Sequence, residues 1–442
     1  MTHGRQCAMN CSRRRFLTAA GLTAGATILS ACGQSTPTPA PTLIPTATLV
    51  PAPTEKTKLS YWQYLTQFEK VETRLFEIYG KRFKAIEVEP TFIAAPDYWS
   101  KLDAALASGA GPDVWNTKPG IIWDRALAGQ VADVTTALTR DYEMTLAVDG
   151  MVLASLDLYK HGDKHFASPR DFEMPVAYLN HDLLGEVPSD DAWKVEDLQA
   201  AVASVSSGGV LGLEPVRDVR LLDALIASQG GAFCEGDISR DLAGMSASYS
   251  SAASTKALSV WLDLATSEKG AAEQPTDAFR EGKAAMAFGW PSLMLELENA
   301  AFSWDVLPLP GCAAGQTTLA SGHGLALNAN GEHPVEAWAL LLWICDPGTG
   351  KSFLDKLNTM PVLTAYTESP DFLDRIPGKN MAAFSALANA TIDPYTFGYS
   401  QWKAAQQAVW DQALTGELAA DAACAEMDKA VNAEWDALRA AL

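Results

Sequence analysis

The chain has 442 residues and carries 53 acidic against 33 basic side chains, which gives a net charge of −20 at pH 7. This acidic excess argues against binding to nucleic acid or to anionic lipid headgroups, because phosphate groups require a positive surface. The residues that follow position 56 suffice for two domains, or for one large unit made of two lobes.

Residues 1–31 are predicted to form an export signal. Three consecutive arginines at 13–15 precede an apolar run that is too short to span a hydrocarbon core of about 30 Å. The stretch SRRRFL resembles the twin-arginine signal, which exports folded proteins, and LSAC at 29–32 resembles a bacterial lipobox. The lipobox implies cleavage before Cys32 and a diacylglycerol on its thiol. The alternative is an ordinary buried helix that happens to contain a cysteine.

Residues 32–56 comprise this cysteine and a segment rich in Pro, Thr and Ala, with almost no charge. Such a composition cannot bury enough apolar surface to offset chain entropy, so a disordered linker is predicted. An extended Pro-rich chain rises about 3.1 Å per residue, so this linker could hold a domain up to roughly 75 Å from a membrane. Two acyl chains anchor stably where one does not. We therefore expect an exported protein that is tied to the outer face of the cell membrane.

The remaining cysteines, Cys234, Cys312, Cys345 and Cys424, are widely spaced and include no C-x-x-C pair. This spacing argues against a metal cluster. Free and mostly buried thiols are expected, although an extracellular location permits disulfides. No metal and no cofactor is predicted.

Alternating strand and helix patterns run through the folded part and predict an α/β fold with mostly parallel sheets. The predicted strands cover 58–64, 86–93, 112–116, 174–180, 284–290, 304–311 and 322–329. The predicted helices cover 68–84, 98–109, 195–204 and 334–346, and two more follow position 400 with a break at Gly416. Helical spacing places Val71, Leu75 and Ile78 on one face of the first of these helices. It places Trp99, Leu102 and Leu106 on one face of the second.

Seven motifs occur in one order along the chain. They are SYWQY, GAGPDV, QVADVT, ASPRDFE with YLNHDLL, FREGKAAMAFGW, LPLPG, and a glycine-rich strand that leads into HPVEAW. Together they resemble the extracellular solute-binding proteins of ABC importers, in particular the sugar-binding, maltose-binding-protein-like group. The resemblance extends from about residue 58 to the C-terminus.

This resemblance implies a two-lobed, type II periplasmic-binding-protein-like fold with the ligand in a cleft between the lobes. Lobe one would comprise 57–168 with 311–347, and lobe two 169–310 with 348–442. Hinges would lie near Pro169, near Pro308 to Pro310, and at Asp346-Pro347. Ligands of open α/β sheets lie beyond the carboxyl ends of strands.

A sugar presents an apolar C–H face to aromatic rings and a rim of hydroxyls to carboxylates, amides and Arg. On this basis and on the resemblance, the predicted ligand-binding residues are Trp62, Gln63, Tyr64, Trp115, Asn116, Lys118, Arg170, Asp171, Glu173, Trp290 and His323. Core packing is the alternative for Trp62, Tyr64 and Trp115. An exposed turn is the alternative for Asn116 and Lys118. A surface salt bridge is the alternative for Asp171 and Glu173, and a structural role is the alternative for His323.

Thirteen tryptophans are more than one binding site needs, so helical spacing assigns seven of them to the core. These seven are Trp123, Trp193, Trp261, Trp338, Trp343, Trp410 and Trp435.

The expected function is capture of a sugar or oligosaccharide and its delivery to an ABC transporter permease by a monomeric, non-enzymatic receptor. A lipid-anchored carbohydrate-active enzyme is one alternative, although no G-x-S-x-G, H-E-x-x-H or P-loop motif occurs. A sugar sensor or adhesin without a transporter is another. A polyol, a glycerol-phosphate ester or a peptide is also open as the ligand.

Overall fold

The structure is a computed structural model. It describes residues 57–138, 153–184, 192–205, 210–236, 244–267, 277–345, 360, 362, 364–385, 390–392 and 398–441. The predicted leader, Cys32, the linker and the hinge at 346–347 lie outside these residues. No helix within the described ranges combines the length and the apolar character that crossing a membrane requires.

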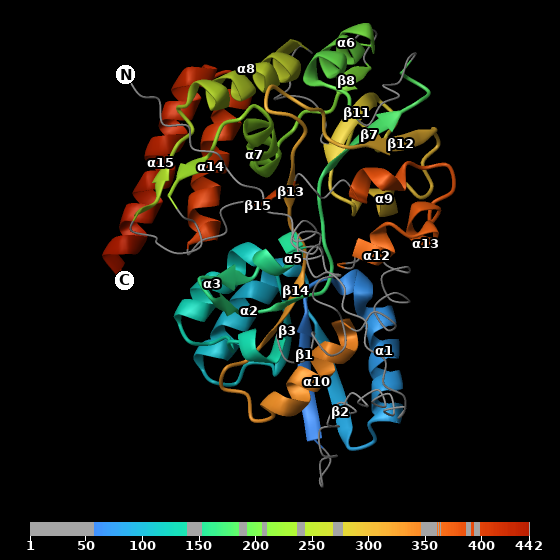
Figure 1. Cartoon of the computed structure of the whole chain (residues 1–442), viewed down its shortest axis with the longest axis vertical. Helices are drawn as coiled ribbons and strands as arrows, with labels where there is room; N and C mark the ends of the chain where they lie inside the picture. The colour runs from blue at the N-terminus through green and yellow to red at the C-terminus, as the bar shows by residue number, and fades with distance from the viewer. Residues whose placement is uncertain are drawn as a thin grey trace, which may run out of the picture. The chain divides into compact units, whose positions relative to one another are not determined.

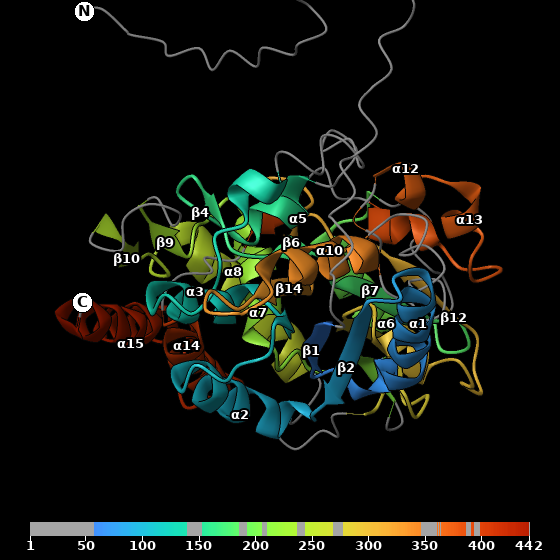
Figure 2. The same ribbon diagram turned by 90° about the horizontal axis from the view of Figure 1, so that it is seen from below.

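Five strands in the order β2-β1-β3-β14-β6 form the first sheet. They are β1 (Thr57–Gln63), β2 (Ile86–Phe92), β3 (Val114–Thr117), β6 (Ser168–Pro169) and β14 (Gly324–Leu327). Strand β1 pairs in parallel with β2 and β3, whereas β14 runs antiparallel to β3 and β6. Helices α1 (Glu69–Arg82) and α10 (Pro334–Cys345) cover one face of the sheet, and α2 (Ala95–Ala107) and α3 (Pro119–Leu127) cover the other (Figures 1 and 2).

The buried stripe of α1 differs in part from the predicted one. Leu75, Phe76 and Tyr79 are buried, whereas Ile78 is 43% exposed. The charged Glu72 completes the buried stripe. Pattern reading assigns inward positions to apolar residues, so it could not place a carboxylate there.

Four strands in the order β12-β7-β11-β8 form the second sheet. They are β7 (Val176–Asn180), β8 (Leu211–Leu213), β11 (Ala284–Gly289) and β12 (Trp304–Leu307). Strand β7 is buried along its whole length: Val176 and Tyr178 pack into one hydrophobic cluster, and Ala177 and Leu179 pack into another. This two-sided burial follows from the alternation of side chains along a strand.

Helices α6 (Val195–Val205), α7 (Val219–Ser228), α8 (Ala252–Ser267), α14 (Tyr399–Leu414) and α15 (Ala420–Ala441) accompany this second sheet (Figure 1). The α/β class is confirmed, but the prediction of mostly parallel sheets is wrong. In the second sheet only β8 pairs in parallel, because β12 and β11 both run antiparallel to β7. Strands β7 and β14 each follow a crossing from the other sheet and run antiparallel to their neighbours. Each of the two sheets is therefore mixed.

The chain crosses between the two sheets at 170–175, which joins β6 to β7, and at 308–323, which joins β12 to β14. The crossing segments pair with each other. Glu173 N–H donates to the Ser321 carbonyl at 2.9 Å, and Ser321 N–H donates back at 2.8 Å. The Arg170 N–H donates to the His323 carbonyl at 2.8 Å. Charged side chains from both segments are thereby brought together between the sheets.

Shorter elements complete the described structure. They are η2 (Thr66–Phe68), α5 (Leu153–Asp157), β4 (Lys160–His161), β5 (Lys164–His165), β9 (Cys234–Glu235), β10 (Ser246–Ala247), α9 (Leu293–Glu296), β13 (Thr318–Ala320), α12 (Thr364–Thr367), α13 (Pro370–Leu373), η5 (Met381–Ser385) and β15 (Ala390–Ile392).

The predictions for the core hold with small exceptions. Six of the seven tryptophans assigned to the core are buried, and Trp343 is partly buried against it. The four predicted free cysteines are free thiols. Only Cys424 is fully buried, and the other three are partly buried.

Candidate ligand-binding site

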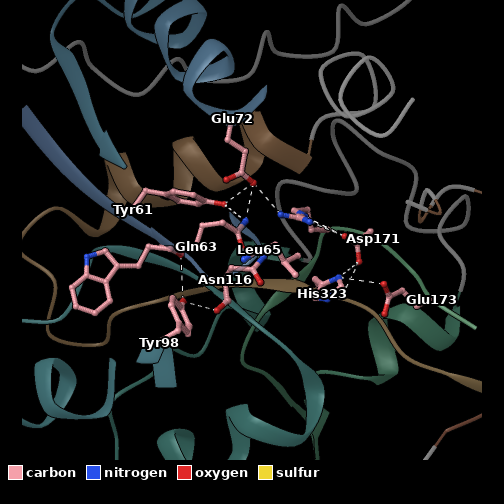
Figure 3. Close-up of polar contacts among 11 residues, drawn as sticks. Tyr61, Gln63, Leu65, Glu72, Tyr98, Asn116, Asp171, Glu173 and His323 are labelled. Atoms are coloured by element: carbon pink, nitrogen blue, oxygen red, sulfur yellow. Dashed lines mark hydrogen bonds and ion pairs between the residues drawn. The ribbon is translucent and has the colours of Figure 1, made fainter. Parts of the chain in front are cut away.

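A buried network of hydrogen bonds starts at Glu72 on α1 (Figure 3). Its carboxylate accepts from the Tyr61 hydroxyl at 3.1 Å and from Gln63 Nε2 at 2.8 Å, both on β1. Arg170 Nη1, from the first crossing segment, donates to the same oxygen at 3.0 Å. Three donors from two elements therefore converge on one carboxylate oxygen and hold α1 against the crossing segment.

Asp171 continues the network toward the second crossing segment (Figure 3). It accepts from Arg170 Nη2 at 2.9 Å, and its other oxygen lies 2.8 Å from both the backbone N and Nδ1 of His323. The approach requires a glycine at 322, which has φ 153°. A Cβ there would lie 2.4 Å from the Asp171 carbonyl oxygen. The glycine beside His323 is therefore a condition for this contact.

Burial and the neighbouring charges shift the pKa values of the network in opposite directions. Burial raises the pKa of Glu72 to about 7, although Arg170 and two neutral donors favour its ionised form. Asp171 is equally buried, but His323 and Arg170 outweigh that effect and lower its pKa to about 2. Burial opposes the charge of His323, yet Asp171 and Glu173 raise its pKa. Asp171 is therefore a buried anion between two cations, Arg170 and His323.

Aromatic rings line the first-sheet side of the site. The ring of Tyr64 lies 4.9 Å from that of Trp99 and 5.3 Å from that of Tyr98, measured between centroids. The ring of His323 lies 5.7 Å from Tyr64. Lys118, at the start of α3, places its Nζ 5.5 Å from the centroid of Trp99. The result is an aromatic surface with a cation at its edge.

Asp218, Arg220 and Trp290 form the second-sheet side. Asp218 caps α7 by accepting from the Arg220 backbone N–H at 3.0 Å, and it also accepts from Arg220 Nε at 2.9 Å. The guanidinium lies 4.5 Å from the Trp290 ring centroid, and the indole N–H donates to Asp218 at 3.2 Å. Tyr178 fixes the backbone by donating to the Trp290 carbonyl at 2.8 Å. This side therefore also presents an aromatic ring with a cation beside it.

Electrostatics connects the two sides. Lys118 is accessible to solvent, yet its pKa is lowered. The largest cause is desolvation by the surrounding protein, and the next is the positive charge of Arg220. Burial raises the pKa of Glu173, although His323 and Arg220 oppose that shift. Residues from the end of β3, the first crossing segment and the start of α7 therefore influence one another at a single site.

Unpartnered polar atoms lie beneath this site. Among the described residues, the Tyr64 hydroxyl and both amide atoms of Asn116 are buried without a hydrogen-bond partner. Buried polar groups in proteins are nearly always hydrogen-bonded, so these atoms have capacity for an additional partner. The backbone of Asn116 is fixed, because its carbonyl accepts from the Tyr98 hydroxyl at 2.7 Å (Figure 3).

The structure brings together five of the residues predicted to bind the ligand, namely Tyr64, Lys118, Glu173, Trp290 and His323. Gln63, Arg170 and Asp171 are fully or almost fully buried in the network behind them. Trp115 and Asn116 are also fully buried, with Trp115 in the hydrophobic core. Trp62 packs partly against the core, and its carbonyl is 3.4 Å from the Tyr98 hydroxyl.

Sequence reasoning missed Glu72, Trp99, Asp218 and Arg220. Helical spacing assigned Trp99 to the stripe of Leu102 and Leu106, but the adjacent Tyr98 is the fully buried residue. Asp218 could have been found as an N-cap, because it directly precedes the helix-forming run VRLLDALIAS. Nothing in the local sequence of Glu72 signals its burial.

Comparison with solved structures reveals the same fold in several sugar-binding proteins. An ABC substrate-binding protein from Listeria monocytogenes, solved in complex with cycloalternan, is 19% identical with a TM-score of 0.75, over 86% of this chain and 99% of that one. The cyclic α-maltosyl-1,6-maltose binding protein from Arthrobacter globiformis is 18% identical with a TM-score of 0.74, over 86% and 99%. The sugar-binding protein MalE from Xanthomonas citri is 17% identical with a TM-score of 0.73, over 87% and 98%. This likeness confirms the predicted two-lobed periplasmic-binding-protein fold.

At the level of sequence, comparison with curated proteins finds no match. A family model described as bacterial extracellular solute-binding protein matches residues 74–378, which is more than half of the chain. The protein therefore belongs to the bacterial extracellular solute-binding protein family.

Proposed function

We propose that the protein binds a sugar or oligosaccharide between two lobes, 57–168 with 311–347 and 169–310 with 348–442. One observation carries this proposal: an aromatic surface from each sheet, each with a cation beside it, occurs where the chain crosses between the sheets. The predicted lobe boundaries fall close to the two described crossings.

The chemistry of the site suits a saccharide. The rings of Trp290 and Trp99 are partly exposed and offer apolar surface for the C–H face of a sugar ring, whereas Tyr64 is buried and packs against Trp99. Lys118 and His323 offer donors, Glu173 offers an acceptor, and the Tyr64 hydroxyl has no partner among the described residues. Sugar hydroxyls both donate and accept, so they match such a mixed set. A polar group left unpaired in the site would penalise a ligand that lacks the matching hydroxyl.

Solved structures of the same fold support this ligand class. They include proteins complexed with cycloalternan, maltotetraose and maltotriose, and one bound with α-D-tagatose. At 17–19% identity they share the fold with this chain, and the ligand is carried over here as part of the proposal.

Delivery of the sugar to an ABC transporter permease completes the proposed role. The signal motifs before Cys32 support export and a lipid anchor at the outer face of the cell membrane. The two-sided site supports a mechanism in which ligand binding favours the closed form that the permease would receive. Binding through non-covalent contacts alone suffices for this role.

A thermal-shift screen of the purified protein tests the ligand class. The panel should contain maltotriose, maltotetraose, tagatose, a polyol, a glycerol-phosphate ester and a short peptide. A ligand that binds only the native state raises the melting temperature by mass action, and we expect this for at least one saccharide. Analysis of the incubated sugar for product tests the enzyme alternative. A shift by the peptide alone, or turnover of a saccharide, would contradict the proposal.

A further inference from the structure

His323 has one ring nitrogen that is used by the protein and one that is not. Its Nδ1 lies 2.8 Å from Asp171 Oδ1 and 3.9 Å from Glu173 Oε1. No described residue hydrogen-bonds Nε2, and that atom is not among the buried unpaired ones. The side chain keeps 13% of its surface exposed. The Nε2 edge is therefore the part of the ring that a ligand can reach.

Asp171 is placed differently. Its side chain has no exposed surface, and both of its oxygens are already engaged, one by Arg170 and one by His323. A saccharide hydroxyl cannot reach this carboxylate without breaking the network. Its only route to the ligand is through the imidazole that it orients.

We propose that His323 acts as a protonated hydrogen-bond donor to the saccharide through Nε2, that Asp171 is its positioning residue, and that saccharide affinity is therefore linked to a proton. This inference rests on the proposed function for the identity of the ligand. The state of the imidazole can be measured without any ligand.

The charges that face His323 support the protonated state. Asp171 and Glu173 on the crossing segment are the nearest anions, and Arg170 is the opposing cation. Arg170 is itself held between Asp171 and Glu72, with Nη contacts of 2.9 and 3.0 Å, so its charge is compensated. Tyr64 adds a neutral ring at 5.7 Å. Lys118 and Arg220 affect His323 through Glu173, whose ionisation they favour.

The link to pH follows from the two nitrogens. In the imidazolium, Nδ1–H donates to Asp171 and Nε2–H donates to the ligand. After loss of one proton, Nδ1 keeps its hydrogen for the carboxylate, and Nε2 becomes a neutral acceptor. A charged donor forms a hydrogen bond about twice as strong as a neutral one. We expect saccharide affinity to fall about fivefold as pH rises through the titration of His323, because the ligand favours the protonated form.

Histidine-selective NMR of the ligand-free protein provides the test, with the His323 signal identified by its loss in His323→Gln. We expect a titration midpoint above the ordinary histidine value of about 6.5 and a hydrogen on Nδ1 in the neutral form. Asp171→Asn should lower the midpoint. Glu173→Gln should lower the His323 midpoint by a smaller amount. If Asp171→Asn fails to fold, Glu173→Gln still provides a decisive test. His333→Gln, on the loop before α10, is the matched control and should leave the midpoint unchanged.

A midpoint at or below about 6.5, or one that neither variant moves, would overturn the inference. The second readout is the affinity for maltotriose between pH 6 and 9, which should fall in the wild type and change little in His323→Gln. Affinity that is flat with pH would also overturn it. Absence of maltotriose binding at every pH would count against that sugar in the proposed function, and the NMR titration would then decide the present inference alone.

Discussion

Two arginines of this protein occupy the same chemical setting with different exposure. Arg170 pairs with Asp171 and lies 4.7 Å from the ring centroid of Phe68, and Arg220 pairs with Asp218 and lies 4.5 Å from that of Trp290. The side chain of Arg170 is 1% exposed, whereas that of Arg220 is 35% exposed. The same three groups thus build a sealed structural support in one place and an accessible surface in the other. Burial, rather than residue type, separates the two roles.

The largest expected effect is on stability at the buried arginine. Arg170→Met removes one of the two cations beside Asp171, which leaves it with His323, and it leaves Glu72 without its charged partner. Removal of one partner from a buried ion pair costs about 3–5 kcal/mol. Denaturant unfolding should show this loss for Arg170→Met. Arg220→Met is the matched control and should cost at most about 1 kcal/mol, because exposed pairs contribute little. Equal losses in the two variants would remove the distinction between the sites.

The next expected effect is on how stability depends on pH, and it arises from the buried carboxylates beside Arg170. Glu72 has a pKa of about 7 in the folded protein, above its ordinary value of 4.5. The folded state therefore binds more protons than the unfolded state between these values, so this group makes stability fall as pH rises from about 4.5 to 7, by up to about 3 kcal/mol. Asp171, with a pKa of about 2, contributes stability above pH 3.8 that is lost as pH falls toward 2. Glu72→Gln should flatten the decline between pH 5 and 7, measured by unfolding at each pH. An unchanged profile would show that Glu72 is ionised throughout.

In the exposed group formed by Arg220, Asp218 and Trp290, the expected effect is on saccharide affinity. Trp290→Ala removes a ring face from the site and should weaken saccharide binding by about 2 kcal/mol, which is roughly 30-fold. Trp290→Phe keeps a ring and should lose less. Isothermal titration with the saccharide found in the screen measures both. Unchanged affinity in Trp290→Ala would place the ligand elsewhere.

The smallest expected effect is at Lys118. Lys118→Met keeps the aliphatic stem over Trp99 but removes the ammonium, so affinity should fall by about 1 kcal/mol, roughly fivefold. The melting temperature of the ligand-free protein should hardly change, because the group has no described carboxylate within 4 Å. A large drop in that temperature would instead assign Lys118 to the support of the fold.

The sequence predicted most of the fold because apolar periodicity and glycine-bounded strands report burial directly. Strands β1, β2, β3, β7, β11 and β14 all fall within a residue or two of their predicted ranges. Strand direction could not be read in this way, since alternation is the same in parallel and antiparallel pairs, and the mixed sheets were missed.

The site was predictable only in part, and for a different reason. Residues at strand ends, such as Lys118 and Trp290, could be placed because ligands gather beyond such ends. Glu72, Asp218 and Arg220 reach the site or its support from helices, and their role depends on contacts between segments far apart in sequence. Local pattern carries no information on such contacts, or on which of two Arg–Asp pairs is sealed from solvent.

The saccharide that gives the largest rise in melting temperature should be crystallised with the protein. The structure of that complex tests directly whether the ligand binds at Trp290 and His323. We expect a sugar ring against the face of Trp290, with hydroxyls within hydrogen-bond distance of His323 Nε2 and Glu173, and with Asp171 still engaged by Arg170. A saccharide bound away from Trp290 and His323, or one in direct contact with Asp171, would contradict this expectation.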